Sequence, residues 1–299
     1  MKIKKYLVKF ALYALLIGVT YVCVFPFLYM IITSLKTSAD LSDVTVNWIP
    51  NSLKWDNFRI ASQAIEYGQG IKNTVLQTVL STIGHLISCG MAGYALARYK
   101  FKGQKLVFLL VIISIIVPLQ TLVIPNYMTF AKLDLLNTMW PIVLPSLFGQ
   151  GLKGGLFIFI FRQFFLGIPK EIEEAAKIDG CSFLGAYFRV ILPMSKSIFL
   201  VVSVLSVAWH WNASYEASIY ISRTIAKPLS SRISVIVDYV TNPPESLFET
   251  MDSLASEQVI NVAVLMAGCF LILLPIIIGF AIVQRYFMQG MERSGLGGD

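Results

Sequence analysis

Few residues of this sequence have the types and spacing that catalysis or metal binding requires. The four cysteines form no CxxC pair and have no histidine close enough in sequence to share a metal: Cys23, Cys89, Cys181 and Cys269. His85 and His210 are the only histidines, so a relay through several imidazoles is excluded. No apolar segment offers a nucleophile with a base or a pair of carboxylates, as an intramembrane enzyme would need. We therefore expect no disulfide, no metal site and no catalytic residue.

Aromatic and polar side chains that could bind a sugar gather near the end of one apolar stretch. Sugars are held by hydrogen bonds to their hydroxyls and by aromatic rings against their apolar faces. On a continuous helix, Trp209, Asn212 and Glu216 would share one face. Trp211 and Tyr215 would share a neighbouring face, and all five are candidates for a substrate path. The competing interpretation is an interfacial tryptophan belt, with Glu216 at the outer end of the span.

A lysine within an apolar stretch is the second unusual feature. Lys153 lies among four glycines, which permit a break or close helix packing, and its insertion costs about 2.5–3.5 kcal/mol at a helix centre. Gln150 and Lys153 are candidates for the translocation path, unless Lys153 extends along its helix to the cytoplasmic surface. His85 is expected to hydrogen-bond between helices rather than to bind a ligand.

The elements that position these residues are predicted to be membrane helices. Of the 299 residues, 56% are hydrophobic and only 14% are charged, which is too apolar for a soluble protein. Charge-free stretches predict six spans, each long enough to cross a bilayer: Phe10–Leu35, Asn73–Ala97, Leu106–Ala131, Leu135–Leu152 continued by Gly154–Phe161, Ser197–Tyr215 and Gln258–Gln284. Spans of this kind are helical, so the expected fold class is an all-α polytopic membrane protein.

The basic residues indicate the orientation of these spans. Fifteen of the 24 basic residues lie on the side of the N-terminus and eight on the other, with Lys153 inside a span. The asymmetry is clearest in the short loop from Arg98 to Lys105, and it predicts that both termini are cytoplasmic. The net charge of +7 is thus explained by topology, and we expect no nucleic-acid partner.

The segment between the fourth and fifth spans predicts two short helices joined at a glycine. Pro169 suits a helix start, and acidic residues follow it, where the helix dipole favours them. Gly180 ends this helix, and a second can begin at Ser182 and run to Pro193. The first helix is shaped to enter a groove of another protein, because Ala175 and Ala176 leave a small surface for close approach. They share one face, at spacings of three and four, with Ile172 and Asp179.

This segment resembles the EAA loop of ABC importer permeases, in which EAA, three residues, Gly, nine residues and I-x-L-P follow one another. The matching residues are Glu174, Ala175, Ala176, Gly180, Val190, Leu192 and Pro193. Val190 stands where the pattern prefers Ile. Residues 208–216 are similar to the WNEF-type segment of maltose-type carbohydrate permeases, although Glu216 lies four residues after Asn212. Residues 284–291 are similar to the QRYFxxG ending of the smaller permease of that family.

The resemblance implies a permease subunit with the type I ABC importer fold in a bacterial inner membrane. Its partners would be a second homologous permease, two ABC ATPases and an external solute-binding lipoprotein. It assigns ATPase coupling to Glu174, Ala175, Ala176, Asp179, Gly180, Leu192 and Pro193. The chain has no GxxxxGK[ST] phosphate loop, so ATP and Mg²⁺ would be bound by the partner ATPase and this chain would hold no cofactor.

We therefore expect a subunit that translocates a sugar or oligosaccharide by alternating access. The expected parts are a cytoplasmic N-terminus (1–9), a first span (10–35), an external loop (36–72), a permease core (73–290) with a coupling loop (168–193) and an external loop (222–257), and a cytoplasmic tail (291–299). The alternatives are an ABC permease for glycerol phosphate or another polar solute, and a secondary transporter. A secondary transporter would show intramembrane carboxylates and usually repeats, and neither is evident.

Overall fold

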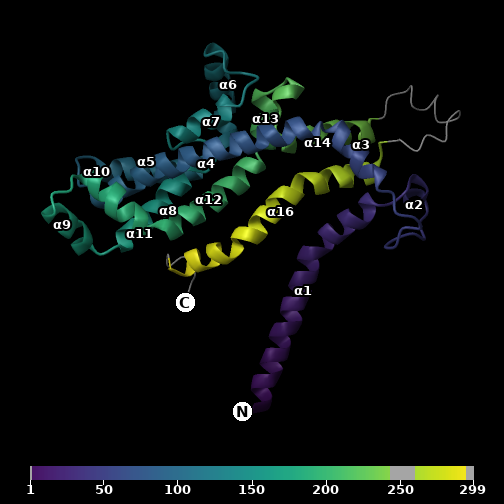
Figure 1. The fold of residues 1–299 in the computed structure, drawn as a ribbon, viewed down its shortest axis with the longest axis horizontal. Coiled ribbons are helices and arrows are strands. Elements are labelled where there is room, and N and C mark those ends of the chain that lie inside the picture. The colour runs from purple at the N-terminus through teal and green to yellow at the C-terminus, as the bar shows by residue number, and fades with distance from the viewer. Residues whose placement is uncertain (1, 243–259, 294–299) are drawn as a thin grey trace. The chain divides into compact units, whose positions relative to one another are not determined.

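The structure, a computed structural model, describes residues 2–242 and 260–293, and the side chains of 6–242 and 260–288. The described residues form helices, connecting turns and loops, with no strand among them, which confirms the predicted all-α fold class (Figure 1). The chain forms two compact units. Unit 1 comprises Met1–Tyr67 and Arg232–Leu274, and unit 2 comprises Gly68–Ser231 and Pro275–Asp299.

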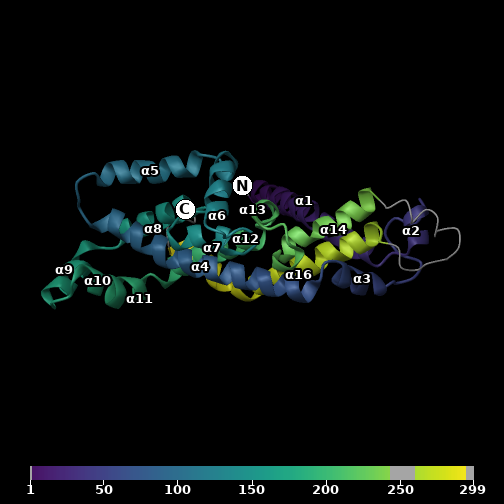
Figure 2. The ribbon, with the colours of Figure 1, turned by 90° about the horizontal axis from the view of Figure 1, so that it is seen from above.

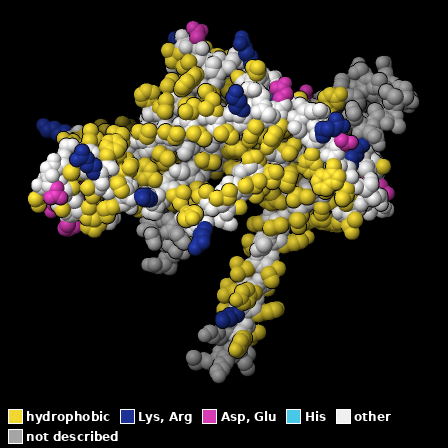
Figure 3. Space-filling view, in the orientation of Figure 1, with side chains coloured by type: hydrophobic (Ala, Val, Ile, Leu, Met, Phe, Trp, Pro, Cys, Tyr) yellow, Lys and Arg dark blue, Asp and Glu magenta, His cyan; other side chains and the backbone are white. Residues whose placement is uncertain are grey.

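Unit 1 contains one long apolar helix, the first part of a second one, and several shorter helices. Its elements are α1 (Lys2–Ser34), α2 (Ser38–Ser42), α3 (Asp56–Ala64), most of α14 (Leu229–Thr241) and the first part of α16 (Val262–Arg293). Phe58 of α3 packs edge to face on Phe270 of α16 with ring centroids 5.9 Å apart. Hydrophobic side chains cover the visible face of α1, as expected of a helix surrounded by lipid (Figure 3).

The segment that follows α1 is ordered by local polar contacts. Thr37 and Asp40 form a capping box at the start of α2, in which each backbone N–H donates to the other side chain at 3.1 Å. Asn51 donates to Asp40 at 2.8 Å, and the buried Lys36 ammonium donates to the carbonyls of Val46 and Asn47. Burial would raise the pKa of Asp40, but the hydrogen bonds from Thr37 and Asn51 outweigh it and hold the pKa below its ordinary value.

Unit 2 is a helical bundle. Its elements are α4 (Tyr67–Arg98), α5 (Gln104–Ile116), η1 (Leu119–Leu122), α6 (Val123–Lys132), α7 (Trp140–Leu147), α8 (Gly154–Gly167), α9 (Lys170–Ile178), α10 (Phe183–Ala186), η2 (Tyr187–Ile191), α11 (Leu192–Met194), α12 (Lys196–Trp211), α13 (Ser214–Tyr220), η3 (Thr224–Ala226) and the end of α16. α8 packs on α5 and α12, and the buried core includes Tyr94, Phe161, Phe165, Ile191 and Val202. In both ribbon views α9 and α10 lie together at one end of this unit (Figures 1 and 2).

The described helices match the predicted spans only in part. Three are long and apolar enough to cross a membrane: Tyr6–Ser34, Tyr67–Arg98 and Val262–Met288. Two bent pairs raise the number to five if each is one span: Gln104–Ile116 with Leu119–Lys132, bent by 99°, and Phe183–Met194 with Lys196–Trp211, bent by 80°. Proline lacks the N–H that continues a helix, and Pro118 lies at the first bend.

The fourth predicted span is not one helix. It consists of α7 and α8, separated by a turn in which Gly149, Gly151 and Lys153 have positive φ. The sixth crossing therefore stays a prediction, as do the cytoplasmic and external assignments of the loops. Residues 243–259 of the predicted external loop and 294–299 of the predicted tail lie outside the described residues.

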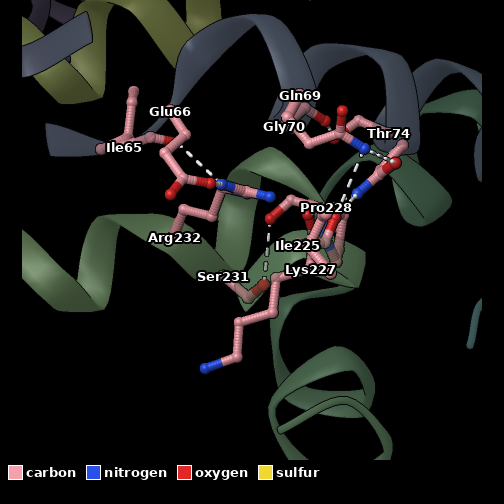
Figure 4. Close-up of polar contacts among 11 residues, drawn as sticks. Ile65, Glu66, Gln69, Gly70, Thr74, Ile225, Lys227, Pro228, Ser231 and Arg232 are labelled. Atoms are coloured by element: carbon pink, nitrogen blue, oxygen red, sulfur yellow. Dashed lines mark hydrogen bonds and ion pairs between the residues drawn. The ribbon is translucent and has the colours of Figure 1, made fainter. Parts of the chain in front are cut away.

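Polar side chains fix helix ends within each unit (Figure 4). In unit 1, the fully buried Arg232 donates to the Glu66 carboxylate at 2.5 Å. In unit 2, the Thr74 hydroxyl donates to the Gly70 carbonyl at 2.9 Å and accepts the N–H of Leu229 at 2.7 Å. Thr74 thereby satisfies one of the N–H groups that the first turn of α14 leaves without an intrahelical partner.

Candidate functional site

The predicted pair of short helices joined at a glycine is confirmed. α9 follows Pro169, carries Glu171 and Glu173 in its first turn, and ends at Ile178 with Asp179 as its C-cap. Gly180 has φ +82°, and its N–H donates to the Lys177 carbonyl at 3.0 Å. This left-handed conformation costs glycine little and strains other residues, so the sharp exit from α9 depends on Gly180.

The second helix of the pair also begins where the sequence predicts. The Ser182 hydroxyl accepts the N–H of Gly185 at 3.1 Å and caps α10. α10, the π-helix η2 and α11 follow without a gap, so the helical segment runs through the exposed Pro193 to Met194 rather than ending at Pro193. The wide π turn lies directly before Leu192-Pro193, and Leu192 packs against the core of unit 2.

The face of α9 predicted to dock on another protein is only partly exposed. Glu173 and Ala176 are buried, whereas Ala175 and Asp179 of the predicted face are exposed. Ala175 and Asp179 of the face predicted to dock on another protein are therefore accessible. Ala176 is buried and Ile172 packs against the core of unit 2, because Glu173 turns inward and sets the rotation of the helix. The exposed residues of α9 and its C-cap, which could meet another protein, are Lys170, Glu171, Glu174, Ala175, Lys177, Ile178 and Asp179.

Glu173 turns inward because it forms an ion pair that the sequence analysis missed. Its Oε1 lies 3.1 Å from Nε of Arg98, and the two side chains are 10% and 5% exposed. The Arg98 guanidinium also donates to the Ile168 carbonyl, just before α9. Arg98 is the last residue of α4, so one side chain joins both the start of α9 and its buried face to a bundle helix.

Aromatic rings reinforce this junction. The Tyr94 ring stacks on Phe183 of α10 with centroids 4.7 Å apart and lies 4.9 Å from the Tyr187 ring of η2. Such ring pairs add stability beyond the area that they bury. The whole loop from α9 to η2 is therefore fastened to the Arg98 end of α4.

The predicted substrate path residues do not lie on one helix. α12 ends at Trp211, Asn212 follows as its cap, and α13 begins only at Ser214. The prediction that Trp209, Asn212 and Glu216 share one face is therefore wrong, because the helix is interrupted between Trp211 and Ser214. Asn212 donates to the Ala208 carbonyl at 3.0 Å and ends the helix locally.

The environments of these residues also differ. Trp211 is buried at 7% exposure, whereas Trp209 and Tyr215 are each 44% exposed. Glu216 is half-buried in α13, outside the candidate span, and burial raises its pKa. Trp211 thus contributes to the core, and Trp209 keeps an accessible ring.

The structure brings two of the candidates from different helices together. The Lys153 ammonium lies 4.5 Å from the centre of the Trp209 ring, a cation–π contact between the start of α8 and the end of α12. The other candidate of this turn, Gln150, is exposed, and its backbone carbonyl lies 2.9 Å from Nε2 of His85.

His85 joins helices through hydrogen bonds, as predicted. Its Nδ1 lies 3.3 Å from the Ser206 hydroxyl of α12, and its ring centroid lies 5.1 Å from that of His210. Nε2 of His210 in turn lies 3.3 Å from the Ser146 hydroxyl of α7. The two histidines are 125 positions apart in the sequence, which gave no sign that they meet. They connect α4, α7, α12 and the turn before α8.

Similar proteins agree with this arrangement. Residues 89–293 match the family described as "Binding-protein-dependent transport system inner membrane component". The chain is 30% identical over 283 residues to the arabinooligosaccharides transport system permease protein AraQ of Halalkalibacterium halodurans, with 94% of this chain and 93% of that protein covered. It is 27% identical over 283 residues to the probable starch degradation products transport system permease protein AmyC of Thermoanaerobacterium thermosulfurigenes, covering 95% and 93%.

A solved structure has the same fold. It is a chain of a bacterial ABC transporter involved in the import of the acidic polysaccharide alginate, with a TM-score of 0.77, 20% identity, and 94% of this chain and 96% of that chain covered. At this identity the likeness establishes the fold, which is the predicted type I permease fold. Since the family match spans the helices from α4 to α16, the chain belongs to the inner membrane components of binding-protein-dependent transport systems.

Proposed function

We propose that this chain is the sugar-translocating permease subunit of an ABC importer and that α9 couples it to a partner ATPase. The observation that carries the proposal is the division of α9 into two sides. One side is held in the protein by the Glu173–Arg98 ion pair, and the other exposes Glu174, Ala175 and Ile178. A short helix that is exposed on one side and attached to its own subunit on the other can transmit a movement imposed by another protein.

The attachment supplies a path for movement. When partner ATPases close on ATP, a displacement of α9 would pull on the end of α4 through Arg98 and on η2 through the stacked rings of Tyr94 and Tyr187. α4 also carries His85, which is bonded to the turn before α8. A shift of the cytoplasmic loop would therefore reach the middle of the bundle, where alternating access must occur.

The substrate class and partners follow from the relatives. Both relatives named above transport oligosaccharides or starch degradation products, which supports a sugar or oligosaccharide as the solute here. The family name supports a solute-binding protein as the source of that solute. We further propose a second homologous permease, two ATPases that hold ATP and Mg²⁺, and cytoplasmic termini.

The deciding experiment is purification of the assembled transporter with its solute-binding protein and identification of the bound solute by mass spectrometry. We expect a sugar or oligosaccharide, and we expect that sugar to stimulate ATPase activity and to enter proteoliposomes only with ATP. Recovery of glycerol phosphate or another non-sugar solute would contradict the sugar assignment. Gradient-driven uptake by this chain alone would contradict the ABC assignment.

A further inference from the structure

Lys153 lies in a turn that contacts His85, near the middle of the candidate span Tyr67–Arg98. Arg162 of α8 lies nine residues after Lys153, the N-cap of this helix, which is about 13 Å of helix and close to half of a hydrocarbon core of about 30 Å. Arg162 lies beside the end of α4, since its Nε donates to the Leu96 carbonyl, and its guanidinium stacks on Phe108. A lysine at this depth needs neighbours that stabilise its charged ammonium group.

The backbone around Lys153 is held rigidly. Lys153 itself has φ +63°, a conformation that non-glycine residues rarely adopt, and it follows two glycines of positive φ, Gly149 and Gly151. The turn is tied to α4 by His85 at the Gln150 carbonyl and by Cys89, whose Sγ lies 3.6 Å from the Gly154 carbonyl. A side chain at Gly154 would lie 2.3 Å from the Gly149 carbonyl oxygen. The position from which Lys153 extends is therefore fixed.

The Lys153 ammonium has an aromatic neighbour but no counter-ion. It lies over Trp209 at 4.5 Å, and no carboxylate among the described side chains forms an ion pair with it. Ionisable side chains within membrane segments face the interior of the bundle or a water-filled path and mark the route of a substrate. Backbone strain that the surrounding contacts maintain is likewise a feature of ligand sites.

We infer that Lys153 and Trp209 form a subsite for a carboxylated sugar unit, such as a uronic acid residue, an inference that rests on the proposed function. The carboxylate would pair with the ammonium, and the apolar face of the pyranose would stack on the accessible indole ring. An anionic phospholipid headgroup does not fit, because headgroups lie at the membrane surface and not at its centre. The solute class is thus an acidic oligosaccharide rather than a neutral one.

The test uses the complete transporter in proteoliposomes, with the partner permease, ATPases and solute-binding protein. Uptake of tetragalacturonate and of neutral galactotetraose is measured with wild type, K153M, K153R and the charge-matched control K132M, whose lysine is exposed at the end of α6. Since every variant receives solute from the same binding protein, a change in the ratio of the two rates arises in the permease. Methionine has a similar length and inserts more easily than lysine, so K153M is expected to assemble.

We expect wild type to import tetragalacturonate faster than galactotetraose and K153M to lose about tenfold or more of the tetragalacturonate rate. K153R should keep most of it, and K132M should match wild type. Equal acidic uptake by K153M and wild type, or a wild-type preference for the neutral sugar, overturns the subsite while sugar transport stands. If neither sugar nor any other saccharide is imported or stimulates ATPase activity, the proposed function fails, and the subsite falls with it.

Discussion

Nε of Arg98, at the end of α4, lies 3.1 Å from Oε1 of Glu173, on the buried side of α9. The neighbouring residue, Glu174, points outward. Two consecutive glutamates therefore have opposite roles, since Glu173 fixes the helix to its own subunit and Glu174 remains available to another protein. The first helix of the coupling loop is therefore attached to the bundle by an ion pair.

Breaking this ion pair from one side should uncouple the transporter. Glu173→Gln leaves the Arg98 charge buried without its partner, and single breaks of buried pairs cost about 3–5 kcal/mol. We expect ATP hydrolysis to continue while uptake per ATP falls several-fold and the thermal midpoint in detergent drops. Arg98→Met with Glu173→Met together should restore part of the midpoint, since neither charge is then stranded. Wild-type uptake per ATP in Glu173→Gln would show that the pair does not transmit movement.

Replacement of Gly180 by a residue that disfavours positive φ should impair coupling. Its φ of +82° is inaccessible to proline and strains alanine by about 1–2 kcal/mol. We expect Gly180→Pro to abolish the stimulation of uptake by loaded binding protein and Gly180→Ala to reduce it. Gly167→Ala is the control, because Gly167 ends α8 without a positive φ and a side chain there meets no neighbour within 4 Å. Coupled transport by Gly180→Pro at the wild-type rate would remove the role of this turn.

Glu174→Ala should have a weaker effect than either change above. Glu174 is exposed in this chain, so its substitution removes no internal contact, and an exposed charge contributes at most about 1 kcal/mol. We expect a moderate loss of ATPase stimulation, with the thermal midpoint of the isolated chain unchanged. A large fall in that midpoint would mean that Glu174 supports the fold rather than the docking surface.

The loop after α1 should lose its order in acid. Because hydrogen bonds lower the folded-state pKa of Asp40 below its ordinary value of 3.8, its carboxylate stabilises the loop above about pH 4, and this stabilisation is lost as the pH falls through the folded-state pKa. A nitroxide at the exposed Val44, in a variant without the native cysteines, should report an ordered loop at neutral pH and a mobile one in acid. Asp40→Asn should be mobile at both. A nitroxide signal unaffected by that substitution would contradict the assignment.

Two threonines one turn apart on α4 should respond oppositely to the same substitution. Thr74→Val leaves the Leu229 N–H without its acceptor and should cost about 1–3 kcal/mol. Among the described residues the buried Thr78 hydroxyl has no hydrogen-bond partner, so Thr78→Val should be neutral or stabilising. Thermal unfolding of both variants in detergent compares them. Equal midpoints would mean that Thr74 does not secure the start of α14.

Local rules predicted those parts of the structure that depend on neighbouring residues. Pro169, Gly180 and Ser182 each act through their own backbone geometry or capping hydrogen bond. α9 begins and ends, and α10 begins, where these residues predict. The rotation of α9 was not predictable in this way. It depends on Arg98, which is 75 positions before Glu173 and belongs to another helix.

The arrangement of the candidate substrate path residues was also not predictable from local sequence rules. The helical spacing of Trp209, Asn212 and Glu216 holds only while the helix continues, and no proline or glycine marks the break at Asn212. The sequence did indicate Lys153 and Trp209 separately as candidates, because a lysine is costly within an apolar stretch and a tryptophan is bulky. Their contact arises from the packing of α8 on α12, which periodicity does not encode.

The buried ammonium of Lys36 has a bearing on topology mapping. Because it is 6% exposed and donates to the carbonyls of Val46 and Asn47, an amine-reactive reagent that cannot cross membranes should fail to modify it on either side of the bilayer. The absence of labelling at Lys36 therefore does not show on which side of the membrane this residue lies. Lys72 and Lys100 are exposed and lie on opposite predicted sides, so the contrast between these two amines in intact cells and in inverted vesicles is what reports the orientation of the chain.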